Sequence, residues 1–189
     1  RQRSQQSCLR SAAQTGSEET ALFDAPVLLT EAHDGSAFDS GEPVLDDWLR
    51  QRAWHNLQNA ASRSYVVCPT GANRIIGYAA LNMGQILAQD VTGAMRRNMP
   101  RHIPAILLGR LAIDRAWQGH GLGRAMLADV IHRASWASME VSARLVVVHA
   151  ISPAAEAFYR HHGFTRLPVE TPTLALDLIK MQKIGGLRE

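Results

Sequence analysis

Apolar residues recur along this chain in two rhythms, which together predict a mixed α/β fold. Short apolar runs bounded by turn-forming residues predict strands. These runs lie at residues 27–30, 64–68, 75–83, 106–114, 144–150, 163–167 and 173–181. Apolar residues at helical spacing predict helices over 43–49, 122–134 and 153–162. The resulting order, β-α-β-β-β-α-β-α-β-β, is that of a single α/β domain.

Local signals sharpen this pattern. Residues 69–73 are turn formers, so the strands on either side are predicted to form a hairpin. Ser152, followed by a proline, is typical of the beginning of a helix. Gly109, in the middle of an apolar strand, indicates a bulge or the close approach of another backbone. Residues 84–105 lack a clear period and predict a long loop, whose length favours a functional role.

The chain has 189 residues, which suits one compact domain with a sizeable core. Residues 1–22 are polar and aperiodic, so we expect a flexible extension there, a folded domain at 23–184 and a tail at 185–189. No apolar run is long enough for a secretory signal or a membrane span. Cys8 and Cys68 are too few for a disulfide framework or a thiolate metal cluster. We therefore expect a cytoplasmic protein without metal or membrane contact.

Charge is distributed unevenly along the chain. The net charge is only +3, but residues 48–113 hold eight arginines and a single acid, Asp90. Arginines that share one face would attract a phosphate-rich partner. Charge runs also serve as ordinary solvated surface, so the composition alone leaves both interpretations open.

The most informative segment is a glycine-rich turn between an apolar strand and a helix, Gln-Gly-His-Gly-Leu-Gly at 118–123. Such a turn points backbone N–H groups outward at a helix N-terminus and binds pyrophosphate. The glycine spacing differs from the dinucleotide fingerprint, and the lysine of a P-loop is missing. What remains is Gln-x-x-Gly-x-Gly.

This pattern resembles the motif of the GCN5-related N-acetyltransferase (GNAT) superfamily. A second match is Ala-Glu-Ala-Phe-Tyr-Arg-His-His-Gly-Phe at 155–164, which fits the family's Ala-x-x-Phe-Tyr-x-x-x-Gly-Phe. The resemblance implies the GNAT fold, a mixed and mostly antiparallel sheet with central splayed parallel strands flanked by helices. It also implies an N-acetyltransferase whose co-substrate is acetyl-coenzyme A (acetyl-CoA).

The resemblance further implies the site. In this family the strand before the turn pairs with the pantetheine arm, the turn cradles the pyrophosphate, and a helical tyrosine protonates the departing thiolate. That tyrosine matches Tyr159, and His120 stands where relatives often carry Arg or Lys. The residues implied to bind acetyl-CoA are Leu111, Ala112, Ile113, Gln118, Gly119, His120, Gly121, Leu122, Gly123, Arg124 and Phe158.

Residues 26–184 more closely resemble the GNAT toxins of bacterial toxin–antitoxin pairs, the TacT and AtaT type. The matching segments include Phe-Asp-Ser-Gly at 38–41, Leu-Asp-Asp-Trp-Leu at 45–49 and Arg-Arg-Asn-Met-Pro at 96–100. Such toxins acetylate the α-amino group of aminoacyl-tRNA and block translation, are neutralised by a ribbon-helix-helix antitoxin, and are often homodimers. The resemblance implies that Arg96, Arg97 and Arg101 contact tRNA phosphates.

No carboxylate is paired so as to act as a strong general base. A free α-amino group titrates near about 7.7–8.0, and an adjacent ester lowers that pKa, so water could accept the proton. His149 is a weaker candidate, since a strand histidine more often fixes the end of a sheet. Two alternatives stay open, a GNAT enzyme acting on a small-molecule or protein amine, and a non-catalytic acetyl-CoA sensor. The acid-poor stretch disfavours cationic small amines, and Tyr159 disfavours the sensor.

Overall fold

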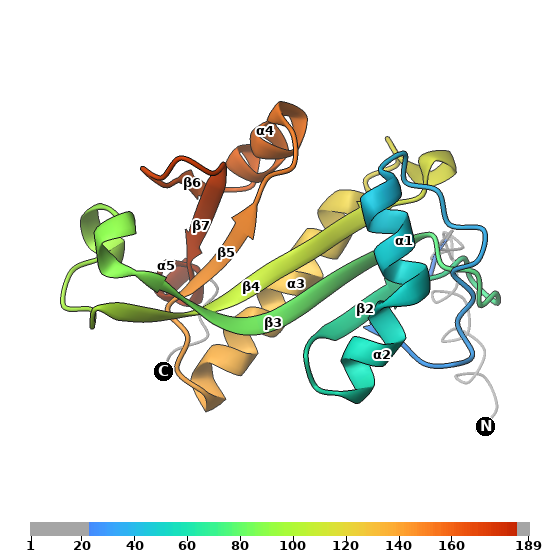
Figure 1. Cartoon of the computed structure of the whole chain (residues 1–189), viewed down its shortest axis with the longest axis horizontal. Coiled ribbons are helices and arrows are strands. Elements are labelled where there is room, and N and C mark those ends of the chain that lie inside the picture. The colour runs from blue at the N-terminus through green and yellow to red at the C-terminus, as the bar shows by residue number, and fades with distance from the viewer. Residues whose placement is uncertain (1–22, 185–189) are drawn as a thin grey trace, which may run out of the picture.

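The computed structural model describes residues 23–184, and the extension predicted at 1–22 and the tail at 185–189 lie outside that part. The strands are β1 (Val27–Leu28), β2 (Arg63–Val67), β3 (Gly77–Leu87), β4 (His102–Ile113), β5 (Leu145–His149), β6 (Thr165–Arg166) and β7 (Thr173–Asp177). The helices are α1 (Pro43–Gln51), α2 (Ala53–Gln58), α3 (Leu122–Glu140), α4 (Pro153–His161) and α5 (Leu178–Ile184), with short 3-10 turns η1 (Ala88–Asp90), η2 (Gly93–Met95) and η3 (Arg115–Trp117). Figure 1 shows their arrangement. Within the described residues, no helix combines the length and apolar character that crossing a membrane requires.

The strands form one sheet in the order β1-β2-β3-β4-β5-β7-β6. β4 and β5 run parallel, and every other neighbouring pair is antiparallel. This confirms the predicted mixed, mostly antiparallel sheet. The predicted hairpin is also confirmed, because β2 and β3 pair antiparallel on either side of residues 69–73.

The parallel pair at the centre of the sheet separates partway along. Pairing between β4 and β5 ends at Leu108 opposite Val148. On the other side of β4 the register against β3 shifts at Gly109, which has no partner, so the predicted bulge is confirmed. Beyond it β4 continues to Ile113 without β5, and Figure 1 shows the two strands diverging there. The bulge therefore marks the point at which β4 leaves β5.

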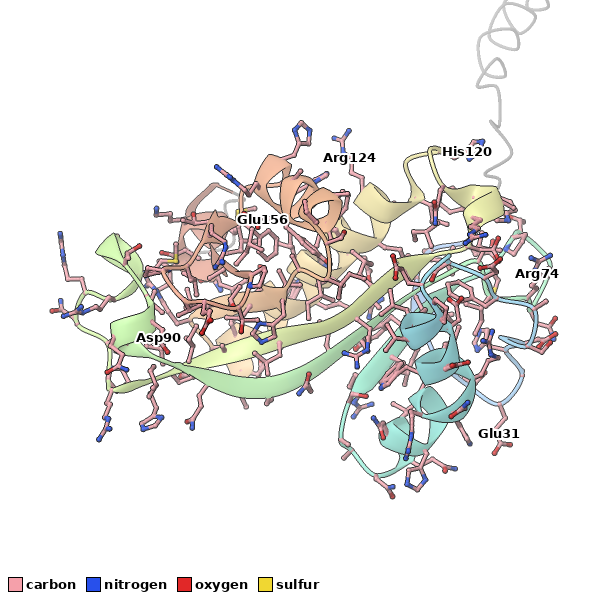
Figure 2. The ribbon with its side chains drawn as sticks, turned by 45° about the horizontal axis from the view of Figure 1, so that its top comes forward. Glu31, Arg74, Asp90, His120, Arg124 and Glu156 are labelled. Atoms are coloured by element: carbon pink, nitrogen blue, oxygen red, sulfur yellow. The ribbon has the colours of Figure 1, made fainter. Side chains whose placement is uncertain are left out.

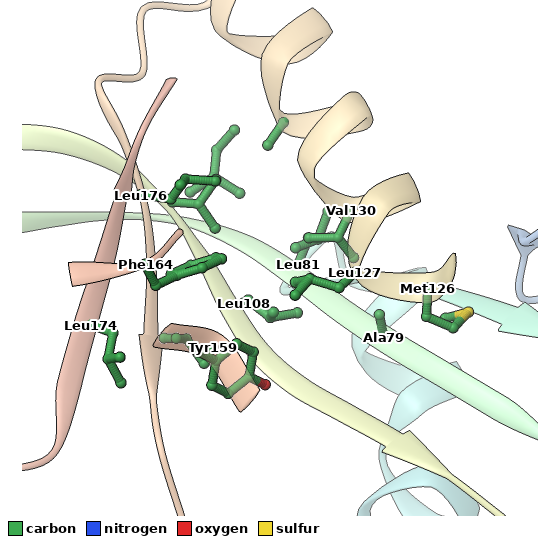
Figure 3. Packing of buried hydrophobic residues seen from close by; sticks show 14 of the residues in the cluster. Ala79, Leu81, Leu108, Met126, Leu127, Val130, Tyr159, Phe164, Leu174 and Leu176 are labelled. Carbon is green, nitrogen blue, oxygen red and sulfur yellow. The ribbon is translucent and has the colours of Figure 1, made fainter. Parts of the chain in front are cut away.

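Alternate strand residues face two helical layers. Val66 packs with Leu45 of α1, whereas its neighbour Val67 packs with Met126 and Val130 of α3. Figure 1 shows α1 and α2 in front of the sheet and α3 behind it, and Figure 3 shows the α3 cluster from close by. A third cluster lies beneath the segment that contains η1 and η2. Both faces of β4 are thus covered by packed side chains.

Several predicted bounds differ from the structure, and two helices, α2 and α5, were not predicted. The last strand, predicted over 173–181, ends at Asp177, whose carboxylate accepts from the backbone N–H of Ile179 and begins α5. Helix α2 was not predicted, because its six residues show no cap and bury only Ala53. β3 and β4 are longer than predicted, so the connection between them shrinks from 84–105 to 88–101.

Candidate active site

The glycine-rich turn has the geometry of an anion site. Gly119 and Gly121 both have φ of +79°, and a Cβ added at either would meet no atom within 4 Å. The space in front of the turn is therefore open, and the backbone conformation is what requires glycine. Gly121 is also the N-cap of α3, and no side chain caps the first N–H groups of that helix. Those unpaired donors, with the helix dipole behind them, suit a pyrophosphate.

Three hydrogen bonds hold this turn against the rest of the fold. The carboxylate of Asp114, only 3% exposed, accepts from the backbone N–H of Ala116 at 3.0 Å. Gln118 Nε2 donates to the carbonyls of Ser40 and Ile113, each at 2.9 Å. Because both amide hydrogens of Gln118 are engaged, its side chain positions the turn, and its contact with a pyrophosphate stays a prediction.

The other predicted pyrophosphate ligands lie at the open end of the same turn. His120 and Arg124 are exposed, and Figure 2 shows both pointing outward. Leu122 is buried beneath the turn, so only its backbone N–H is available to a ligand. A Cβ added at Gly123 would lie 3.7 Å from Ile113 and 3.9 Å from Phe158, which shows that turn, strand and α4 meet there.

The separated end of β4 offers an unpaired backbone edge. Leu111, Ala112 and Ile113 pair with β3 on one side, while β5 has already ended its pairing on the other. Ala112 is buried in the cluster beneath α1, and Leu111 and Ile113 pack against the α3 cluster. This stretch of β4 therefore has an edge without a strand partner, as a pantetheine arm requires, although the Ile113 carbonyl already accepts from Gln118 Nε2.

Tyr159 comes to the same gap from α4. The helix begins at Ser152, whose Oγ accepts from the backbone N–H of Ala155 at 3.1 Å, which confirms the predicted cap. The Tyr159 ring packs in the α3 cluster, 5.5 Å from Phe164, and Figure 3 shows it beside Leu108. Burial raises the pKa of Tyr159 above its ordinary value. The phenol therefore stays protonated at neutral pH and is able to donate.

A cavity of about 60 Å³ adjoins Tyr159. It is lined by Leu45, Leu108, Gly109, Arg110, Leu111, Val148, His149, Ile151, Ala155 and Tyr159. Sequence reasoning did not single out Arg110 for the site, although its place directly after the bulge glycine was a usable signal. His149 Nδ1 lies 2.9 Å from Thr173 Oγ1, so the ring is tied to β7 as expected of a histidine at the end of a sheet. The cavity thus lies between the separated strands β4 and β5, with α1 and α4 contributing to its walls.

The predicted RNA-binding arginines lie elsewhere, between β3 and β4. Arg96 and Arg97 line an open hollow of about 520 Å³. Arg101 is exposed on the same connection but is not part of that lining. Arg144 anchors the connection, since its Nη2 donates to the Ala94 carbonyl and lies 2.8 Å from Asp177. The structure therefore brings two of the three arginines together.

Among residues 23–184, no group of three or more His, Cys, Asp and Glu side chains is placed to hold a metal ion. Cys68 is buried there as a free thiol, and burial raises its pKa. The candidate site described so far consists of the turn, the unpaired strand edge and Tyr159.

Comparison with known proteins agrees with this geometry. Residues 61–166 match the family described as acetyltransferase (GNAT) domain. The chain is 43% identical over 154 residues to the tRNA-acetylating toxin of Mycobacterium tuberculosis (strain ATCC 25618 / H37Rv), over 82% of this chain and 92% of that protein. AtaT complexed with acetyl-methionyl-tRNAfMet superposes with a TM-score of 0.81 and 27% identity, over 86% of this chain and 99% of that one. An AtaT variant bound to acetyl-CoA and the C-terminus of the antitoxin AtaR superposes with a TM-score of 0.74 and 26% identity, over 87% of this chain and 98% of that one.

This chain therefore belongs to the GNAT acetyltransferase family. It is an N-acetyltransferase whose co-substrate is acetyl-CoA, as the motif resemblance predicted. The fold prediction is confirmed by the same comparisons.

Proposed function

We propose that this protein is a toxin that acetylates the α-amino group of aminoacyl-tRNA and thereby blocks translation. The observation that carries the proposal is the 43% identity to a tRNA-acetylating toxin, over 92% of that protein's length. The AtaT complexes with acetyl-methionyl-tRNAfMet and with AtaR support the same acceptor and a cognate antitoxin. The proposal includes an antitoxin of the ribbon-helix-helix type, a homodimeric toxin and a cytoplasmic site of action.

The donor site fits acetyl-CoA on three counts. The backbone N–H groups of residues 119–124 would bind the pyrophosphate, because the start of α3 is uncapped and the space before it is open. The free edge of β4 at 111–113 would pair with the pantetheine amides. Phe158, which meets Gly123, would cover the arm between the two. When bound, acetyl-CoA supplies a thioester carbonyl beside the Tyr159 cavity.

Tyr159 would act as the general acid. The acceptor nitrogen forms a bond to the acetyl carbon, the carbon–sulfur bond breaks, and the Tyr159 proton passes to the thiolate. The amine releases its own proton to water, and solvent restores the phenol. Burial raises the pKa of Tyr159, so the phenol is protonated at neutral pH and its proton is available as the thiolate develops. A positioned acid of this kind contributes about 10²–10⁴-fold in rate.

The arginines between β3 and β4 would bind the phosphates of the acceptor stem. Arg96 and Arg97 line one open hollow, and Arg101 is exposed on the same connection. Each arginine that neutralises a phosphate releases counterions, so binding becomes steeply dependent on salt. Recognition through backbone charge and shape suits a stem, since its deep groove hides the bases.

The test is translation in a cell-free extract supplied with labelled acetyl-CoA. Wild-type protein should arrest translation, and mass spectrometry should find acetyl groups on tRNA-linked amino acids. Tyr159→Phe, which keeps the packing and loses the hydroxyl, should do neither at the same concentration. Acetylation of free or protein amines without arrest of translation would contradict the proposal and favour the alternative acceptors.

A further inference from the structure

A half-buried arginine faces the acceptor side of the Tyr159 cavity. Arg110 follows the bulge glycine of β4 and lines the cavity together with Tyr159. Its guanidinium lies over the ring of Trp48, 5.6 Å from the ring centroid, and Trp48 in turn stacks on Tyr78. The arginine is therefore held in place by a layer of aromatic rings rather than free in solvent.

The charge of Arg110 has no counterion among residues 23–184, since no carboxylate lies within ion-pair distance of it. Its Nη1 donates to the Gly109 carbonyl at 2.6 Å. Its Nε is buried and has no acceptor. A buried donor left without a partner is costly, so it indicates a ligand that completes the site.

The geometry points to Arg110 as the residue that selects the acceptor: its Nε–H donates to the carbonyl next to the attacking amine, and its charge keeps that amine neutral. This inference rests on the proposed function and extends it from the donor side to the acceptor side. In an aminoacyl ester only the α-carbon separates the amine from the ester carbonyl group, whereas a lysine side chain carries no carbonyl near its amine.

The electrostatic part of this role follows from Coulomb's law. A fixed cation several ångströms from an ammonium ion disfavours the charged form of the amine and lowers its pKa. The neutral amine is the nucleophile, so by lowering the amine pKa Arg110 would reduce the need for a general base. The same charge would repel cationic amines, which fits the scarcity of acids around the cavity.

Other titratable groups face this region, and the test must distinguish their effects on the pH profile from that of Arg110. They are Asp46 of α1, Tyr78 of β3, His149 of β5 and Tyr159 of α4. Asp46 already accepts from the backbone N–H and the hydroxyl of Ser40. Tyr78 donates to the Leu45 carbonyl, and burial raises its pKa. His149 lines the same cavity, so it is varied separately in the test.

The experiment is the pH profile of single-turnover transfer from labelled acetyl-CoA to a pool of aminoacylated tRNA. The rising limb of this profile should report the pKa of the acceptor amine in the bound complex. Arg110→Gln, which removes the charge, should move the limb upward by about one pH unit, so that the rate on the limb falls about tenfold. Arg110→Lys, which keeps the charge but lacks Nε–H, should leave the rising limb at the wild-type pH and lower the maximal rate at the plateau. His149→Gln should also leave the rising limb at the wild-type pH.

The matched control is Arg63→Gln, which removes an exposed arginine of β2 that does not line the cavity. It should match wild type, and all variants should bind acetyl-CoA with unchanged affinity if they are folded. A profile of Arg110→Gln that superimposes on wild type would overturn the inference, as would loss of the limb in His149→Gln. Failure of the wild type to label aminoacyl-tRNA would instead remove the proposed function itself.

Discussion

Gln118 Nε2 donates to the Ser40 carbonyl at 2.9 Å, across 78 positions of the chain. This bond ties the glycine-rich turn to the loop that leads into α1. Since Leu45 of α1 lines the Tyr159 cavity, the bond connects the glycine-rich turn to the helix that forms one wall of that cavity. Displacement of the turn would therefore also shift α1, which forms part of the cavity wall.

Gln118→Leu should weaken acetyl-CoA binding about tenfold, because it removes two hydrogen bonds that position the turn. Calorimetric titration with acetyl-CoA measures the effect. Gln58→Leu, an exposed glutamine at the end of α2, is the matched control and should bind as wild type does. Unchanged affinity in Gln118→Leu would show that the turn holds its shape without these bonds.

Gly121→Ala should lower the free energy of unfolding by about 1–2 kcal/mol and also weaken acetyl-CoA binding, because a left-handed backbone strains any residue with a Cβ. Gly71 has a φ of +76° with equally open space around it, but lies in the β2–β3 turn. Gly71→Ala should thus lower the free energy of unfolding by a similar amount to Gly121→Ala and leave acetyl-CoA affinity unchanged. Equal loss of affinity in both variants would argue against an anion site at the start of α3.

Tyr159→Phe should bind acetyl-CoA normally and slow acetyl transfer by about 10²–10⁴-fold, because the ring keeps its packing and only the proton is lost. Tyr65→Phe, on β2, is the control and should retain the wild-type rate. Steady-state transfer to aminoacyl-tRNA measures both. A rate within a few fold of wild type in Tyr159→Phe would exclude the general-acid role.

Alkaline pH should destabilise the fold through Tyr78 and Tyr159, whose pKa values burial raises. Below the ordinary tyrosine pKa of about 10 both states hold these protons, and stability does not depend on them. Above it the unfolded chain releases protons that the folded chain keeps, so the free energy of unfolding falls as pH rises. Denaturant titrations between neutral pH and about pH 11 should show this slope, and Tyr159→Phe should reduce it. A slope identical in wild type and variant would exclude the contribution of Tyr159.

Arg96→Gln combined with Arg97→Gln should weaken tRNA binding and flatten its dependence on salt by about two units of log–log slope. Filter binding at several salt concentrations measures the slope, and acetyl-CoA affinity should be unchanged. Arg63→Gln serves again as the control. A slope equal to that of wild type would mean that the hollow between β3 and β4 does not contact phosphates.

The strand, glycine-rich turn and helix of the candidate donor site were predictable because their signals are local. A strand, three glycines and a helix follow one another at 106–134, and Ser152 marks the next helix by its own side chain. Arg110 was missed because its importance depends on Trp48, which lies 62 positions earlier and meets it only in the folded sheet. Helix α5 was missed although its signal is local, since the Asp177 carboxylate accepts from the backbone N–H of Ile179 and ends the strand within an apolar run.

The most direct test of the donor site is a crystal structure of Tyr159→Phe with acetyl-CoA. The pyrophosphate should lie on the backbone N–H groups of residues 119–124, with pantetheine along 111–113. The thioester sulfur should lie where the missing Tyr159 hydroxyl would reach it within hydrogen-bond distance. A pyrophosphate bound away from the start of α3, or a sulfur on the far side of β4 from residue 159, would contradict this assignment.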